Sequence, residues 1–272
     1  MALLIDRGFV RLPSGLVHYR SAGNGDGLPL LMAHAGPGSS LGLVPMFEAL
    51  ADGRRLIAPD MLGNGDSEAH ALAAPQIEHY ADDVASLLDA LAIERVDFYG
   101  QHTGAHIGCE FALRHPGRVR RLVLDGVGLF PAALRAALQA HYAPPMAPDD
   151  HGGHLLWAWT FVRDLSLHFP YFQRDPAHRL HDSAVPPPAA LHSLTVELLK
   201  ALPSYHLAYA AAFAHPIAAR LPLLTVPTLL MTVQGDPLGQ WLDAAAALLP
   251  TAQLLRTARA GRGLTVRDFI DG

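Results

Sequence analysis

The chain has 272 residues, of which 50% are hydrophobic and 17% charged, so it is long enough to bury a sizeable core in one domain with an insertion. This composition excludes a disordered tail protein. The 20 lysine and arginine residues against 25 aspartate and glutamate residues give a net charge of −5, and no basic run stands out that could neutralise a phosphate backbone, so we expect no nucleic-acid partner.

Cysteine usage and the apolar segments indicate the cellular setting. Cys109 is the single cysteine, which excludes an internal disulfide, and the start MALLIDRGFV places Asp6 and Arg7 where a secretory signal needs an unbroken apolar run. The longest uncharged stretch, residues 201–219, is interrupted by prolines and histidines, so we expect no membrane-spanning segment. A reducing, cytoplasmic location fits these features best.

The first half of the chain alternates short apolar runs with segments of helical periodicity, a pattern typical of parallel strands joined by crossover helices. A Pro-Ser-Gly turn predicts a hairpin over residues 9–19. Further strands are predicted at 28–33, 55–58, 96–99 and 122–124. Helices are predicted at 43–52, 76–91 and 103–114. The fold class is therefore α/β.

The composition changes from residue 130 to residue 220, where proline, histidine and aromatic residues are frequent and no strand periodicity is visible. We interpret residues 130–220 as a helical lid, with a helix at 189–202, inserted into a core of residues 1–129 and 221–272. After this segment, an apolar run predicts a strand at 226–233, which is followed by a predicted helix at 240–249 and a last strand at 253–255.

The lid supplies aromatic side chains that can line an apolar pocket or seat the lid on the sheet. Trp157, Trp159 and Phe161 are the lid residues that we expect to bind substrate. We therefore expect a small apolar or aromatic substrate rather than a sugar or nucleotide.

Four blocks in chain order resemble motifs of one known superfamily. They are HAGPGSS at 34–40, DMLGNGDS at 60–67, GQHTG at 100–104 and PTLLMTVQGDP at 227–237. They are similar to the oxyanion loop, the DxxGxGxS turn, the nucleophile elbow and the acid-bearing strand of the α/β-hydrolase superfamily. The resemblance covers nearly the whole chain and is closest to the lidded members: proline iminopeptidases, haloalkane dehalogenases, epoxide hydrolases and C–C hydrolases. It implies a mostly parallel twisted sheet with helices on both faces and a helical lid.

The chain departs from this family pattern at two positions. His102 occupies the centre of the elbow, where the family has Ser, Cys or Asp, and the last histidine of the chain is His215. The segment that should hold the family's catalytic histidine has Arg262 instead. The Ser-His-Asp triad is therefore absent. The sequence GSSLG at 38–42 fits the pattern GxSxG, but it belongs to the oxyanion loop, and we do not assign a nucleophile to it.

The remaining site residues still allow carbonyl chemistry. A neutral imidazole has a free lone pair near pH 7, so His102 can act as a general base or attack a carbonyl directly. Asp125 and Asp236 both follow strands where the family places its acid, and either can orient His102. The resemblance implies that the amides of Gly36 and Thr103 donate to an oxyanion.

Three further assignments complete the predicted site. His34 lies in the oxyanion loop, where it has a structural or a substrate-binding role. Arg262 either pairs with Asp236 or faces solvent. His102 and His106 have the spacing of two metal ligands on a helix, but no third ligand shares their helix face, so we expect no metal and no cofactor.

The sequence thus predicts a cofactor-independent enzyme that acts on an apolar ester, lactone or other carbonyl compound. Two alternatives stay open: a lyase, decarboxylase or cyclase on the same fold, and a catalytically silent ligand-binding homologue. A homodimer is compatible with all three.

Overall fold

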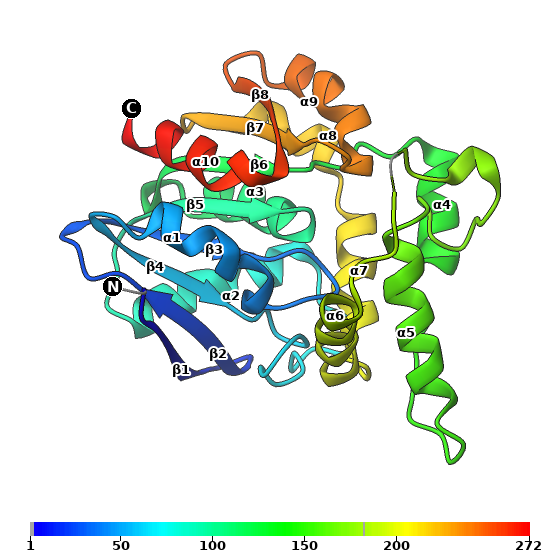
Figure 1. Cartoon of the computed structure of the whole chain (residues 1–272). Helices are drawn as coiled ribbons and strands as arrows, with labels where there is room; N and C mark the ends of the chain where they lie inside the picture. Colours follow the sequence, from blue (N-terminus) through cyan, green and yellow to red (C-terminus); the bar gives the residue numbers. More distant parts are fainter. Residues whose placement is uncertain (1–2, 182) are drawn as a thin grey trace.

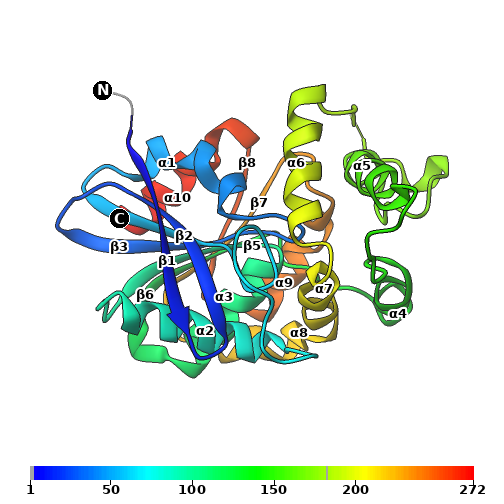
Figure 2. The same ribbon diagram turned by 90° about the horizontal axis from the view of Figure 1, so that it is seen from below.

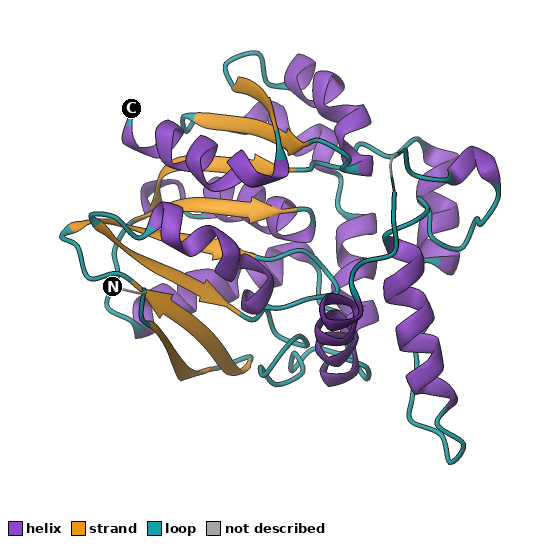
Figure 3. Ribbon diagram, in the orientation of Figure 1, coloured by secondary structure: helices purple, strands orange, loops and turns teal. Residues whose placement is uncertain are grey.

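The structure is a computed structural model that describes residues 3–181 and 183–272. Its centre is an eight-stranded sheet with the order β1-β2-β4-β3-β5-β6-β7-β8 (Figures 1 and 3). β2 is antiparallel to both of its neighbours, and all the other pairs are parallel. The strands are β1 (Ile5–Leu12), β2 (Gly15–Ala22), β3 (Gly27–Ala33), β4 (Arg54–Pro59), β5 (Val96–Gln101), β6 (Val119–Asp125), β7 (Thr228–Val233) and β8 (Gln253–Thr257).

Helices occupy both faces of the sheet and its carboxyl edge. The α-helices are α1 (Val44–Leu50), α2 (Ile77–Ala90), α3 (Thr103–Arg114), α4 (Ala132–His141), α5 (Gly153–Leu165), α6 (Pro188–Lys200), α7 (Tyr205–Ala214), α8 (Ile217–Arg220), α9 (Leu242–Leu248) and α10 (Arg262–Asp271). The 3-10 turns are η1 (Ser40–Leu43), η2 (Pro116–Arg118), η3 (Pro176–His178), η4 (Leu221–Leu223), η5 (Pro237–Trp241) and η6 (Arg259–Gly261).

The two faces of the sheet bury separate apolar clusters. α1 and α10 cover one face, where Phe47 and Ile270 pack against β-strand residues such as Leu30. α2, α3 and α9 cover the other face, and Figure 2 shows the sheet between the two layers. Because each strand of the parallel part is covered on both sides, these strands read as continuous apolar runs in the sequence.

The predicted α/β class, the predicted strands and the helices that alternate with them are confirmed. The sequence reading missed α10. This helix carries Val266, Phe269 and Ile270, which are all buried and have the i, i+3, i+4 spacing of a helix face. The signal was therefore present, but it spans less than three turns in a segment that is otherwise polar.

The segment between β6 and β7 contains α4 to α8. Figures 1 and 2 place α4 to α7 beside the carboxyl ends of the parallel strands. Its interior is aromatic: the ring of Trp157 stacks on that of Phe161 with the centroids 5.0 Å apart, and Phe161 meets Tyr171 edge to face at 4.5 Å. Among the described residues, no helix has the length and apolar character needed to cross a membrane.

Glycines allow α3 to approach the sheet closely. A Cβ atom on Gly104 would lie 2.3 Å from the carbonyl oxygen of Ala33 on β3, and one on Gly100 would lie 2.1 Å from the carbonyl oxygen of Gly104. Both obstacles are backbone atoms, which cannot rotate away as a side chain does. The start of α3 is therefore fixed against β3 and β5.

Gly104→Ala tests this close packing. We expect the variant to lose about 1–3 kcal/mol of unfolding free energy, measured by urea denaturation, because overpacking against backbone outweighs the better helix propensity of alanine. Gly117→Ala is the matched control, since a Cβ there meets nothing within 4 Å, and it should change the free energy by less than about 0.5 kcal/mol. Equal stability of the two variants would contradict the packing argument.

Candidate active site

His102 forms a sharp turn between β5 and α3. Its backbone has φ 49° and ψ −109°, in the positive-φ region that residues other than glycine rarely adopt. Its N–H donates to the carbonyl oxygen of Asp125 over 2.8 Å. Gly126, with φ +75°, leaves room for the imidazole, because a Cβ atom there would lie 2.4 Å from Cδ2 of His102. The elbow predicted from GQHTG is therefore present, with a histidine at its tip.

Asp236 orients the imidazole of His102. Nε2 of His102 lies 2.7 Å from Oδ2 of Asp236, and the other carboxylate oxygen, Oδ1, accepts the backbone N–H of Leu238 over 2.8 Å. The ionised carboxylate can only accept, so Nε2 carries the proton and donates it. Nδ1 is the nitrogen left with a lone pair in the neutral ring. No described residue hydrogen-bonds with Nδ1.

This pair shifts the titration of both partners. Burial lowers the pKa of His102, but the charge and hydrogen bond of Asp236 outweigh burial and raise the pKa above its ordinary value. Burial raises the pKa of Asp236, but the interactions with His102 and with the amide of Leu238 outweigh it, so the pKa of Asp236 is lowered. The imidazole therefore keeps its proton to a higher pH than an ordinary histidine, and the carboxylate stays ionised to a lower pH than an ordinary aspartate.

Asp125 is the other carboxylate considered from the sequence, and it has different partners. The hydroxyl of Tyr99 donates to Oδ2 of Asp125 over 2.7 Å, and Nε of Arg262 lies 3.1 Å from the same oxygen. Burial raises the pKa of Asp125, although Arg262 and Tyr99 oppose this shift. The choice that the sequence left open is thereby resolved: Asp236 contacts the ring of His102, and Asp125 lies beneath the elbow.

The predicted contact between Arg262 and Asp236 is wrong. Arg262 begins α10, which the sequence reading did not foresee, and the helix directs the guanidinium towards the carboxylate of Asp125. The Arg262 side chain is 11% exposed, and Asp125 is fully buried. The arginine therefore supplies positive charge to a carboxylate that would otherwise be buried beside one tyrosine.

A cavity of about 250 Å³ lies in front of His102. Its walls combine the elbow, the oxyanion loop and lid aromatic residues: Gly36, Pro37, His102, Thr103, His106, Phe130, Tyr142, Leu165, Phe169, Tyr209, Ala212, Phe213, Pro237 and Leu238. The hydroxyl of Tyr209 donates to the carbonyl oxygen of Gly36 over 2.7 Å. Both Gly36 and Thr103 line the cavity, and no described residue accepts a hydrogen bond from their backbone N–H groups; donation by them to an oxyanion stays a prediction.

The lid residues on the cavity wall differ from those expected. Trp157, Trp159 and Phe161 pack in the lid interior and do not line this cavity, which corrects their assignment to the substrate. The wall is formed instead by other aromatic residues, Phe130, Tyr142, Phe169, Tyr209 and Phe213. The sequence showed that residues 130–220 are rich in aromatic side chains, but it could not show which rings turn inward.

His34 is engaged within the protein. Its Nδ1 donates to the carbonyl oxygen of Ala35 over 2.9 Å, and its Nε2 accepts the N–H of Met61 over 3.0 Å. Burial lowers the pKa of His34, which agrees with a neutral ring that donates once and accepts once. His34 joins the oxyanion loop to the turn after β4, and it does not line the cavity, so the substrate-binding assignment is corrected to a structural one.

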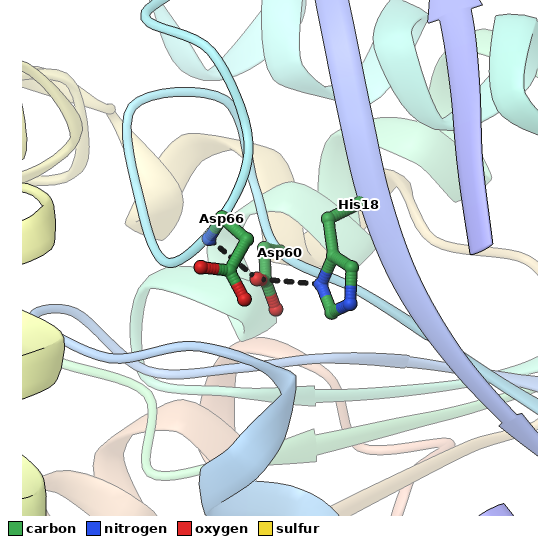
Figure 4. A group of neighbouring side chains, drawn as sticks. All are labelled: His18, Asp60 and Asp66. Atoms are coloured by element: carbon green, nitrogen blue, oxygen red, sulfur yellow. Dashed lines mark hydrogen bonds and ion pairs between the residues drawn. The ribbon is translucent and has the colours of Figure 1, made fainter. Parts of the chain in front are cut away.

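Figure 4 shows His18, Asp60 and Asp66, whose ligand atoms are close enough together for a metal ion. Hydrogen bonds already engage them. Oδ2 of Asp60 accepts Nδ1–H of His18 over 2.8 Å and the N–H of Asp66 over 2.9 Å, and Oδ1 accepts from Ser40. Nε of Arg7 donates to the other His18 nitrogen over 2.9 Å. These contacts hold the DxxGxGxS turn against β2, and we assign no metal to them.

Sequence reasoning missed the role of His106. This residue was considered as a metal partner of His102, but each ring has its own partner: Asp236 for His102, and His215 for His106, with 3.0 Å between the two Nδ1 atoms. Its helical spacing from the elbow places it on the cavity wall. The sequence offered no sign that His215, far away along the chain, would meet it.

Comparison with known proteins adds family evidence to this geometry. The family described as alpha/beta hydrolase fold matches residues 29–263. A haloalkane dehalogenase 2 of Mycobacterium tuberculosis is 30% identical over 231 residues, which cover 82% of this chain and 75% of the relative.

Other similarities are shorter or purely structural. A 2-hydroxymuconate semialdehyde hydrolase of Pseudomonas sp. (strain CF600) is 46% identical over 108 residues, so the match spans only 38% of this chain and 38% of that relative's length. The crystal structure of the enol-lactonase from Burkholderia xenovorans LB400 superposes with a TM-score of 0.73 at 20% identity, covering 97% of this chain and all of the other. This likeness shows a shared fold.

Asp236→Asn tests the electrostatic coupling at His102. The variant removes the negative charge with little change of shape, so the pKa of His102, followed by NMR titration, should fall below the wild-type value. Asp243→Asn is the control, because Asp243 is 73% exposed and pairs with Arg256. An unchanged pKa of His102 in Asp236→Asn would contradict the assignment.

The same coupling predicts how stability depends on pH. The raised pKa of His102 gives a contribution that is complete below its unfolded pKa, about 6.5, and is lost as pH rises through the folded pKa. The lowered pKa of Asp236 gives a contribution present above its unfolded pKa, about 3.9, and lost as pH falls. The stability difference between wild type and Asp236→Asn should therefore be largest between about pH 4 and 6.5, measured by urea denaturation.

Proposed function

Because the chain belongs to the α/β-hydrolase fold family, we propose that it is a cofactor-independent hydrolase of a small apolar ester or lactone, with His102 as its general base. The observation that carries this proposal is the position of the His102–Asp236 pair. His102 lies on the wall of an apolar cavity that Gly36 and Thr103 also line, and Asp236 holds the ring of His102 through Nε2.

Each step of hydrolysis can be assigned to a group of this site. Neutral His102 takes a proton from water through Nδ1, and the resulting hydroxide adds to the substrate carbonyl carbon. The N–H groups of Gly36 and Thr103 stabilise the oxyanion, and such a donor typically contributes about 3–4 kcal/mol. Asp236 stabilises the imidazolium. His102 then returns the proton to the leaving oxygen as the tetrahedral intermediate collapses.

Direct attack by His102 on the carbonyl is less favourable in this geometry. Nε2, the more accessible nitrogen of an imidazole, donates to Asp236 at 2.7 Å. The available nitrogen is Nδ1, which is crowded by the ring's own Cβ. Proton transfer from water needs less space around Nδ1 than bond formation to carbon, so the geometry favours a base over a nucleophile.

The cavity favours a small substrate with an aromatic or aliphatic group. Its volume is about 250 Å³, its lid side is formed by phenylalanine and tyrosine rings, and a second pocket of about 780 Å³ shares His102, Leu165 and Pro237 with it. Apolar burial drives the binding of such a group, and edge-to-face contacts orient it.

A non-hydrolytic reaction is the second candidate, because the elbow presents a base where the family has a nucleophile. The same donors can stabilise an enolate after His102 removes a C–H proton, which gives lyase, decarboxylase or cyclase chemistry. Incorporation of ¹⁸O from labelled water into the product distinguishes hydrolysis from these reactions.

His102→Ala tests the assignment of the base. On a panel of 4-nitrophenyl esters and lactones, kcat should fall by at least about 10², because loss of a general base typically costs 10²–10⁴. The variant also loses the stabilising pair with Asp236, so its folded state should be checked by circular dichroism at the assay temperature. His192→Ala, an exposed position on α6, is the control and should keep wild-type turnover. Wild-type turnover by His102→Ala would overturn the proposal.

Fluorophosphonate probes should not label this protein. Ser40 donates its hydroxyl to Asp60 over 2.5 Å, and the hydroxyl of Ser39 accepts the N–H of Leu41 over 3.1 Å. Both serines are buried and neither contacts a histidine base. Mass spectrometry should therefore find no adduct, and stoichiometric labelling of either serine would show that GSSLG holds a nucleophile.

A further inference from the structure

A chain of buried polar side chains begins on the cavity wall one helical turn beyond His102. His106 lines the cavity, and its Nδ1 lies 3.0 Å from Nδ1 of His215, between α7 and α8. Nε2 of His215 lies 2.8 Å from Oε1 of Glu110 on α3. Arg220 closes the chain at the surface, donating to the two carboxylate oxygens over 2.5 and 3.0 Å. None of the steps proposed above uses these groups.

The charge of Glu110 fixes the direction of the hydrogen bonds that it accepts, and the direction of the His106–His215 bond follows for a neutral His215 ring. Burial raises the pKa of Glu110, but hydrogen bonds from His215 and Arg220 outweigh burial and hold it at about 2, so the carboxylate is ionised and accepts. His215 must donate through Nε2, which leaves a lone pair on Nδ1 of its neutral ring. His106 therefore donates through Nδ1, and its Nε2 has a lone pair that no described residue occupies.

Proton uptake by His106 alone would be unfavourable. Burial lowers its pKa to about 3, because the apolar surroundings disfavour an imidazolium there. The hydrogen-bonded chain offers another location for the charge. If Nε2 gains a proton while Nδ1 passes its own proton to His215, the imidazolium forms on His215, next to the carboxylate of Glu110.

We propose that His106, His215 and Glu110 form a proton-accepting relay that opens onto the cavity and selects a carbonyl substrate with an acidic hydroxyl, such as a phenol. The inference rests on the proposed function, because it refines the substrate of the same cavity. The substrate O–H bond breaks, an N–H bond forms at Nε2 of His106, and the Nδ1 proton moves to His215. No electrons are transferred, and the relay gains one proton.

The roles within the relay differ. His106 is the catalytic residue, because it lines the substrate cavity. His215 and Glu110 are positioning residues that act through it. The titratable and charged groups around His106 come from several elements. His102 precedes α3 and Glu110 lies on it, His215 lies between α7 and α8, Arg220 ends α8, and Arg135 lies on α4.

A purely structural clamp would use the same contacts. Glu110 lies on the core helix α3, while His215 and Arg220 lie where the lid returns to the core, so the network also joins the two parts. A clamp predicts only lower stability when it is broken. The relay predicts in addition a fixed tautomer of His106 and a preference for hydroxylated ligands.

NMR of ¹⁵N-histidine-labelled wild-type protein tests the tautomer directly. Long-range ¹H–¹⁵N correlations at pH 7, assigned with His106→Phe, should show His106 protonated at Nδ1 and unprotonated at Nε2. A ring protonated at Nε2 alone, or at both nitrogens, would overturn the relay. This measurement is made on the wild-type protein and does not depend on turnover, and His106→Phe serves only to assign the peaks of His106.

Binding of non-hydrolysable ketones tests the selectivity. In NMR titrations, at least one of the three hydroxyacetophenones should bind wild type about tenfold more tightly than acetophenone, the value expected for one hydrogen bond to a buried acceptor. His106→Phe, which keeps an aromatic ring, should lose this preference, and the control His192→Phe should retain it. Equal binding of all four ketones to wild type would contradict the proposal.

Kinetics of methyl hydroxybenzoates and methyl benzoate test the positioning residues. Glu110→Gln removes the charge that supports His215, so the ratio of kcat/KM values for the hydroxylated over the plain ester should fall about tenfold, mainly through a higher KM for the hydroxylated ester. An unchanged ratio would overturn the roles of Glu110 and His215. If wild type hydrolyses none of these esters and none of the 4-nitrophenyl esters and lactones, the proposed function fails, whereas the tautomer and the ketone preference still test the relay.

Discussion

The backbone of His102 is the constraint on which the site depends. A residue with φ 49° turns β5 directly into α3, and this turn projects one side chain over the carboxyl ends of the parallel strands. Gly104 lets α3 approach β3, and Gly126 makes room for the ring. These requirements concern the backbone, so a histidine can occupy the tip without changing the fold around it.

Once histidine occupies the elbow, the neighbouring charges are arranged differently from a serine triad. Asp236 bonds directly to the elbow residue His102, whereas in a serine triad a histidine lies between the acid and the elbow residue. Arg262, in the segment where the family has its histidine, pairs with Asp125 beneath the elbow. Asp236 therefore orients the ring of His102, and the charge of Asp125 is balanced by Arg262. The site that we propose keeps a base and oxyanion donors and has a histidine where a serine triad has its activated hydroxyl.

Local patterns predicted the parts of this structure that depend on local sequence. The strands, the elbow at His102 and the oxyanion loop each have a short motif with a backbone requirement. Contacts between distant segments were beyond such patterns. The pairing of Arg262 depended on a helix that was not foreseen, and the meeting of His106 with His215 depended on how the lid returns to α3. Likewise, whether an aromatic ring between β6 and β7 faces the cavity depends on its packing, which the spacing of aromatic residues in the sequence does not determine.

The central claim is that the His102–Asp236 pair is the base of the reaction. The most direct measurement compares two quantities in the wild-type protein: the apparent pKa of the pH profile of kcat/KM for its fastest ester or lactone, and the pKa of His102 by NMR. The account predicts that kcat/KM rises with pH as His102 loses its proton and that the two pKa values coincide, above the ordinary value for histidine. A flat profile, or a kinetic pKa that differs from that of His102, would contradict it.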